Sequence, residues 1–186
     1  MSSGKLKLLG IAVVCLAPVF GSYLLYWLWE PSKQMNYGEL LPPKPLPEAV
    51  LKLDDGSPFE PARLRGKWLM VMADSADCGE PCRRKLYLMR QVRKAQGKEL
   101  ARIERVWLIE DAAPVADALR QEYEGTLFVR AAGSALLASL PPGTGLRDHV
   151  FLVDPLGNVM LRYPKDPDPK PVLKDIGRLL KYQRTG

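Results

Sequence analysis

The chain has 186 residues, 47% of them hydrophobic, so it can bury one substantial core, and its length favours one domain with appendages over two domains. Its formal net charge is +6 at pH 7, and residues 31–186 hold 25 of the 27 basic and 20 of the 21 acidic residues. This positive balance suits an anionic membrane surface or an acidic partner protein.

The first thirty residues contain a long apolar run. Residues 8–29 carry no charge over 22 positions, and as a helix they would be about 33 Å long, enough to cross a hydrocarbon core of about 30 Å. The run is long for a signal peptide, Val14 fits lipidation of Cys15 poorly, and a buried core helix rarely stays uncharged for so long. We therefore predict a membrane anchor over residues 1–30.

The flanking charges predict the orientation of this anchor. Lys5 and Lys7 precede the apolar run, whereas Glu30 and Lys33 cancel after it. The bias favours a single-pass protein of the inner (plasma) membrane, with its N-terminus in the cytoplasm and its C-terminal domain periplasmic or exoplasmic. We expect no nucleic-acid partner in that compartment.

A proline-rich segment follows the anchor. Residues 31–48 contain five prolines and little apolar pattern. We predict that residues 31–47 form an extended linker and that residues 48–186 form the folded domain.

The rest of the chain alternates strand-like and helix-like patterns. The pattern predicts strands at residues 50–53, 67–73, 105–109, 125–130, 149–153 and 158–163, and helices at residues 81–95, 114–123, 134–140 and 172–182. This order predicts an α/β fold, a mixed sheet flanked by helices. It is the layout of a thioredoxin-like domain.

Two cysteines, Cys78 and Cys82, follow the strand predicted at 67–73. A disulfide between them would close a short loop and contribute only about 2 kcal/mol of chain entropy, so stapling is a poor reason for the pair. Pro81 favours a helix beginning there, which places Cys82 in its first turn and Cys78 on the preceding loop. The helix dipole and the basic residues after Cys82 would stabilise a thiolate at that position.

Such a pair has two uses, metal binding and reversible oxidation, and the spacing alone does not distinguish them. The basic residues that follow, including Arg83, Arg84 and Lys85, are expected to form a solvated helix face.

A third ligand would decide between these uses, and His149 is the one histidine in the chain. It opens a predicted strand beside a Pro/Gly loop, where ligands gather in open α/β folds. Asp148 or a backbone carbonyl can fix its tautomer. Two thiolates and an imidazole suit Cu(I) or Cu(II), whereas a closed zinc site needs a fourth ligand that the sequence does not offer.

Three features together resemble the Sco/SenC family, membrane-anchored thioredoxin-like proteins that help to build the dinuclear copper centre of cytochrome c oxidase. These are "CGEPC" after a buried strand, "DH" before a late strand, and the run "HVFLVDPLGNVMLRY". The resemblance extends from the anchor to the last helix. It implies that Cys78, Cys82 and His149 bind copper. The family commonly has a proline directly after the second cysteine, where this chain has Arg83.

Three hypotheses follow. In the first, the chain is a copper-binding assembly factor rather than an enzyme, and its partners are a copper donor protein and the copper-bearing subunit of the oxidase. In the second, it is an enzyme, a membrane-tethered thiol-disulfide oxidoreductase whose catalytic residues are Cys78 and Cys82. In the third, it is a thioredoxin-like scaffold with incidental cysteines. Replacing His149 should weaken metal retention under the first hypothesis and leave activity intact under the second.

Overall fold

The computed structural model describes residues 3–28, 36–141 and 145–182, and it divides into two compact units, Met1–Met35 and Asn36–Gly186. The first unit contains helix α1 (Ser3–Leu28), which includes Pro18. Its segment Gly10–Trp27 is apolar and long enough to cross a membrane, and none of its residues is buried inside the protein. Trp29 and residues 31–35, which belong to the predicted anchor and linker, lie outside the described residues.

The second unit contains eight strands and four α-helices among its described residues. The strands are β1 (Glu39–Pro45), β2 (Leu51–Leu53), β3 (Pro58–Phe59), β4 (Trp68–Asp74), β5 (Ile103–Ile109), β6 (Thr126–Arg130), β7 (Val150–Val153) and β8 (Asn158–Arg162). The helices are α2 (Glu80–Ala95), α3 (Asp117–Glu122), α4 (Ala135–Ser139) and α5 (Pro169–Tyr182), with short 3-10 helices η1 (Pro61–Leu64), η2 (Gly97–Arg102) and η3 (Leu146–Asp148).

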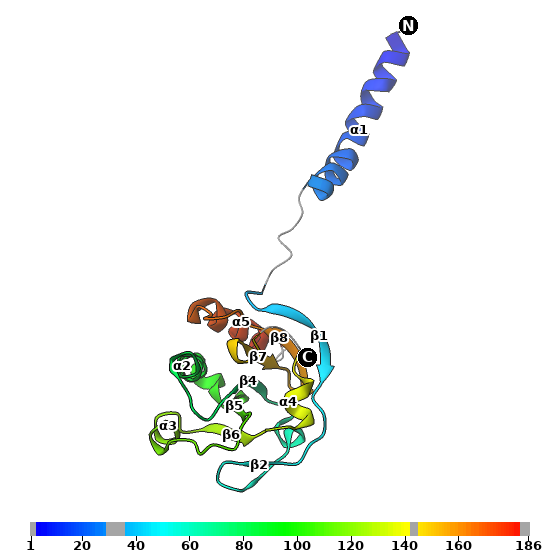
Figure 1. The fold of residues 1–186 in the computed structure, drawn as a ribbon. Helices are drawn as coiled ribbons and strands as arrows, with labels where there is room; N and C mark the ends of the chain where they lie inside the picture. Colours follow the sequence, from blue (N-terminus) through cyan, green and yellow to red (C-terminus); the bar gives the residue numbers. More distant parts are fainter. Residues whose placement is uncertain (1–2, 29–35, 142–144, 183–186) are drawn as a thin grey trace. The chain divides into compact units, whose positions relative to one another are not determined.

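The strands form one mixed sheet in the order β1-β8-β7-β4-β5-β6-β2-β3. Strands β4, β5 and β6 are parallel, and β7 pairs antiparallel with β4. Figure 1 shows α2 and α5 on one side of the central strands and α4 on the other. This arrangement confirms the predicted mixed sheet flanked by helices.

Strand β4 is the centre of the domain because all seven of its residues are buried. Successive side chains of a strand point to opposite faces. Met70 and Met72 accordingly join the apolar cluster under α2 and α5, whereas Leu69 and Val71 join the cluster under α4. A strand buried on both faces reads as a continuous apolar run, which is why this one was predicted from sequence.

Strand β1 lies inside the segment predicted as a linker. It pairs antiparallel with β8 at the edge of the sheet, a position that tolerates its prolines because one side of an edge strand needs no hydrogen-bond donors. The buried carboxylate of Asp175 holds the start of this segment, accepting hydrogen bonds from the backbone N–H groups of Tyr37 (2.7 Å) and Gly38 (3.0 Å). Residues 39–45 are therefore extended, but they are part of the sheet rather than of a linker.

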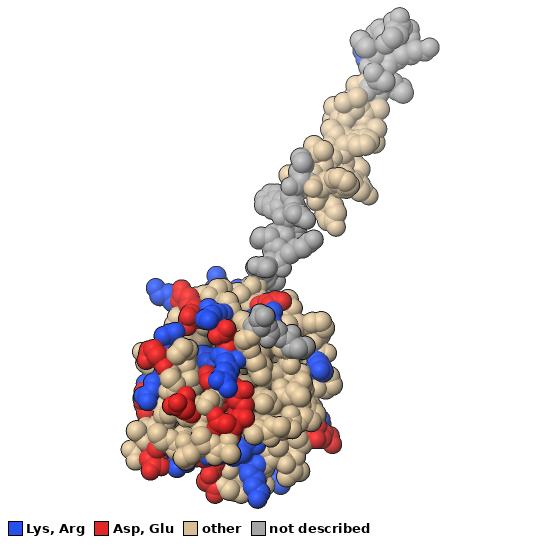
Figure 2. Space-filling model, in the orientation of Figure 1, with Lys and Arg blue, Asp and Glu red and all other residues tan. Residues whose placement is uncertain are grey.

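Acidic and basic side chains are interspersed over the face of the second unit in Figure 2. On α2, Arg84 pairs with Asp166 at 3.1 Å, and Arg93 and Lys67 both approach Glu104. Many basic side chains of the domain thus have a carboxylate partner. A basic side chain without one is therefore a candidate for binding an anionic group of another molecule.

Candidate functional site

Cys78 and Cys82 form a disulfide with a Cα–Cα distance of 5.2 Å. Gly79 is the N-cap of α2, and Pro81 lies in the first turn. Cys82 therefore occupies the first turn and Cys78 the loop before it, as predicted. Both are buried, with 6% of Cys78 and 2% of Cys82 exposed. The residues around the disulfide therefore control access to the sulfurs.

The loop that carries Cys78 is held by hydrogen bonds from both ends. The backbone N–H of Cys78 donates to the carbonyl of Ala76 (2.9 Å), and that of Asp77 donates to Oγ of Ser75 (3.1 Å). Asp111, after β5, accepts from the backbone N–H of Ala76 (3.2 Å). The pKa of Asp111 is lowered, chiefly by a hydrogen bond from the Ser75 side chain.

This lowered pKa predicts an acid-sensitive loop. A carboxylate whose folded pKa is depressed stabilises the fold above its unfolded pKa, and this stabilisation is lost as pH falls through the lower folded value. We expect reduction of the disulfide by a phosphine, relative to a linear peptide disulfide, to accelerate below pH 4 as the loop opens. In an Asp111→Asn variant this acid-dependent acceleration should disappear. An unchanged pH profile in the variant would show that Asp111 does not hold the loop.

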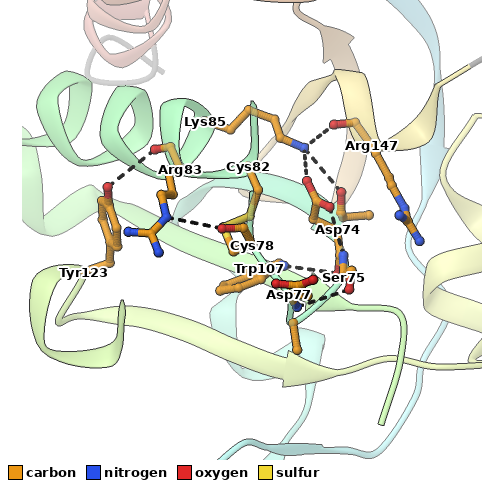
Figure 3. The surroundings of a disulfide bond; sticks show 12 residues. Asp74, Ser75, Asp77, Cys78, Cys82, Arg83, Lys85, Trp107, Tyr123 and Arg147 are labelled. Atoms are coloured by element: carbon orange, nitrogen blue, oxygen red, sulfur yellow. Dashed lines mark hydrogen bonds and ion pairs between the residues drawn. A yellow bond between two sulfur atoms is a disulfide. The ribbon is translucent and has the colours of Figure 1, made fainter. Parts of the chain in front are cut away.

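Lys85 joins the three segments around the disulfide (Figure 3). It lies one turn after Cys82 on α2, is 5% exposed, and its Nζ donates to Oδ2 of Asp74 at 2.8 Å. The same Nζ donates to the carbonyl of Arg147, two residues before His149. Because Asp74 ends β4 and leads into the cysteine loop, this one buried ammonium ties together the segments that carry Cys78, Cys82 and His149.

The expectation that Lys85 lies on a solvated helix face is wrong. Lys85 is three residues after Cys82 and four before Met89, both of which are buried, and helix positions at these spacings share a face. That spacing is the sequence signal that identifies a buried lysine here. A buried lysine needs a partner, and Asp74 supplies it.

His149 lies at the same end of the sheet as the cysteines. Strand β7 runs antiparallel to β4 with Val150 opposite Met72, so the start of β7 lies beside the end of β4. His149 directly precedes Val150 and is partly buried, with its ring 6.2 Å from that of Phe151. The fold therefore brings His149 to the end of the sheet from which the cysteine loop emerges.

A backbone contact fixes the tautomer of His149. Its Nδ1 lies 2.8 Å from the carbonyl oxygen of Tyr163, and a carbonyl can only accept. Nδ1 therefore carries a proton, and in the neutral imidazole Nε2 is the nitrogen with the available lone pair. Histidine ligands of metals commonly have this arrangement, in which the second ring nitrogen donates to a carbonyl.

The structure brings the two cysteines together but does not place His149 in a metal-binding group with them. Within the described residues, no three His, Cys, Asp or Glu side chains lie close enough to hold a metal ion. The sulfurs are bonded to each other here, and metal ligation requires thiolates. This is the geometry of the oxidised chain.

Comparison with known proteins supports the fold. The family model described as "Transmembrane-like, thioredoxin-like, C-terminal domain" matches residues 68–183. No curated protein is significantly similar in sequence to the chain.

Several solved structures share the fold. Yeast Sco1 with copper bound is 17% identical, with a TM-score of 0.60 over 74% of this chain and 94% of that one. The apo Sco1 protein of Thermus thermophilus is 18% identical, with a TM-score of 0.58 over 82% and 99% of the two chains. A putative protein disulfide isomerase from Bacteroides thetaiotaomicron is 18% identical, with a TM-score of 0.55 over 81% and 92%. The resemblance to Sco/SenC proteins is thus confirmed in the fold.

Proposed function

This chain belongs to the transmembrane-like, thioredoxin-like C-terminal domain family, and from this premise we propose that it is a membrane-anchored copper-binding assembly factor. Its cargo is copper, bound by the thiolates of Cys78 and Cys82 and by Nε2 of His149. The recipient is the copper-bearing subunit of cytochrome c oxidase, whose dinuclear copper centre it helps to build, and a separate donor protein supplies the metal.

The observation that carries this proposal is the arrangement of the cysteines and His149 at one end of the central strands. Two sulfurs lie together there, and the histidine that begins the neighbouring strand presents a basic Nε2 because Tyr163 fixes its Nδ1 proton. Thiolates favour Cu(I), and imidazole binds both copper states. Yeast Sco1, which shares the fold, has been solved with copper bound.

Copper binding requires reduction of the disulfide. Reduction frees two thiolates at the start of α2, where the helix dipole stabilises negative charge. The His149 ring then has to approach them from its present position. Lys85 keeps the loop before His149 fastened to α2, so we infer that the approach is made by local rotation rather than by displacement of the strand.

The anchor determines the membrane and the compartment in which this function is carried out. We propose that α1 spans the inner (plasma) membrane with its N-terminus in the cytoplasm, since Lys5 and Lys7 precede the apolar segment. The copper-binding domain then lies on the periplasmic or exoplasmic side. Residues 31–38 lie between the anchor and β1, the first strand of this domain.

The direct test is copper uptake by the full chain in detergent micelles. We expect the reduced chain to bind copper stoichiometrically in the presence of a competing chelator, and the disulfide form to bind none. A Cys78→Ser, Cys82→Ser variant should also bind none. A reduced parent chain that fails to retain copper would rule the proposal out.

A second candidate is a thiol-disulfide oxidoreductase. The pairing of Cys78 and Cys82 at a helix N-terminus favours it, as does the shared fold with a putative protein disulfide isomerase. In this reading the chain is an enzyme that acts on cysteines of a partner protein, and copper uptake is absent. Exchange activity that survives replacement of His149 is its signature.

A further inference from the structure

A cavity of about 450 Å³ lies beside the start of α2, the helix that carries Cys82. It lies over the first two turns of α2, and its wall includes Arg83, Arg84, Tyr87, Leu88, Tyr123 and Pro167. Two carboxylates, Glu80 and Asp166, also line it, and both lie within ion-pair distance of Arg84. Arg83 connects the cavity to the cysteine loop, because it lines the cavity and its Nε lies 3.2 Å from the carbonyl of Cys78.

Arg83 is the cation of this cavity that has no carboxylate partner in the described part of the chain. Its Nε donates to the carbonyl of Cys78 at 3.2 Å, and its two terminal nitrogens have no hydrogen-bond acceptor among those residues. Arg84, by contrast, is paired with Asp166 (3.1 Å) and Glu80 (3.8 Å). A guanidinium fork that is free and positioned in this way matches a carboxylate.

The two tyrosines of the cavity wall contact neighbouring arginines. The guanidinium of Arg90 lies 5.0 Å from the ring of Tyr123 and 5.5 Å from the ring of Tyr87. The Tyr123 hydroxyl donates to the backbone carbonyl of Arg83 at 3.4 Å. Aromatic side chains and arginine are enriched at protein interfaces, and a rigid wall reduces the entropy lost on binding.

We propose that this cavity recognises an acidic residue next to the cysteines of the partner protein. The proposal rests on the proposed function only in requiring that Cys78 and Cys82 meet cysteines of a partner. Because Arg83 holds the backbone of Cys78, a carboxylate bound to its free nitrogens places the neighbouring sulfur of the partner close to Cys78. The acidic residue thus selects the partner protein and aligns its sulfur with Cys78.

Disulfide exchange with a dithiol peptide reports this docking. A peptide thiolate attacks Sγ of Cys78, the Cys78–Cys82 bond breaks, and Cys82 leaves as a thiolate. The second peptide thiolate then attacks the peptide sulfur of the mixed disulfide, and Cys78 leaves. The peptide is oxidised by two electrons, the protein disulfide is reduced, and the two thiol protons pass to solvent.

The test compares two synthetic dithiol peptides that differ only in having Glu or Gln beside their cysteines. Each rate with the full chain in micelles is divided by the rate of the same peptide with the uncharged hydroxyethyl disulfide, which corrects for differences in thiol reactivity. We expect the acidic peptide to react about tenfold faster, as a charge-assisted hydrogen bond allows. In Arg83→Gln the two rates should become equal, and in Arg83→Glu the preference should reverse.

Lys94→Gln is the matched control, since it removes the same charge from the exposed far end of α2 and should keep the preference. Equal rates for the two peptides with the parent chain would overturn the proposal, and so would a preference that Arg83→Gln leaves unchanged. Either outcome leaves the copper proposal standing, because copper uptake is measured without a peptide.

Discussion

The His149→Ala variant is expected to lose copper at least about 100-fold more readily than the parent chain. Loss of a residue that only orients a metal ligand typically costs 10–100-fold in affinity, and His149 is proposed to be a ligand itself. The measurement is a chelator competition with the reduced chain in micelles, comparing the parent and the variant.

Disulfide exchange provides the control for this experiment. His149 is not needed to break or form the Cys78–Cys82 bond, so His149→Ala should exchange with a small thiol at the rate of the parent chain. A variant that keeps parental copper affinity would remove His149 from the site. A parent without copper affinity but with rapid exchange would favour the oxidoreductase.

The second large effect concerns stability. Replacing Lys85 by methionine leaves the carboxylate of Asp74 buried and without its cation. Removing one partner of a buried ion pair typically costs about 3–5 kcal/mol. We expect a loss of this size in the free energy of unfolding, measured by urea denaturation of the disulfide form in micelles.

Two further variants separate this pair from a general charge effect. Adding Asp74→Asn to Lys85→Met removes the uncompensated charge while an amide oxygen can still accept from the backbone N–H of Ser75, so much of the loss should be recovered. Lys94→Met, on an exposed position of the same helix, should change the unfolding free energy by less than about 0.5 kcal/mol. A Lys85→Met variant as stable as Lys94→Met would contradict the buried pair.

The helices and central strands of the domain were predictable because local pattern and tertiary position agree. Strand β4 is apolar throughout since both of its faces are covered, and α2 begins where Pro81 and the preceding glycine set its start. The predicted position of Cys82 in the first turn follows from these local signals alone.

The edge of the sheet was not predictable in the same way. Strand β1 contains prolines, which argue against a strand unless it lies at an edge, and the edge position is set by pairing with β8 far along the chain. Lys85 is buried although it is charged, because its spacing from Cys82 and Met89 places it on the buried face of α2, where Asp74 pairs with it. Both errors arise from tertiary context that a local pattern does not contain.

The relation between His149 and the cysteines depends on strand order. The sequence places His149 at the start of a strand, but that β7 lies beside β4 and antiparallel to it is a property of the folded sheet. The hydrogen bond to Tyr163 is likewise set by pairing of the last two strands. The sequence left Asp148 or a backbone carbonyl open as the partner of the imidazole, and the folded chain uses the carbonyl of Tyr163.

X-ray absorption at the copper edge of the reduced, copper-loaded chain tests the central claim most directly. The account predicts that two sulfur atoms and one imidazole nitrogen surround the metal, and that the imidazole signal disappears in His149→Ala. A spectrum with sulfur ligands alone, or an imidazole signal that persists in the variant, would contradict it.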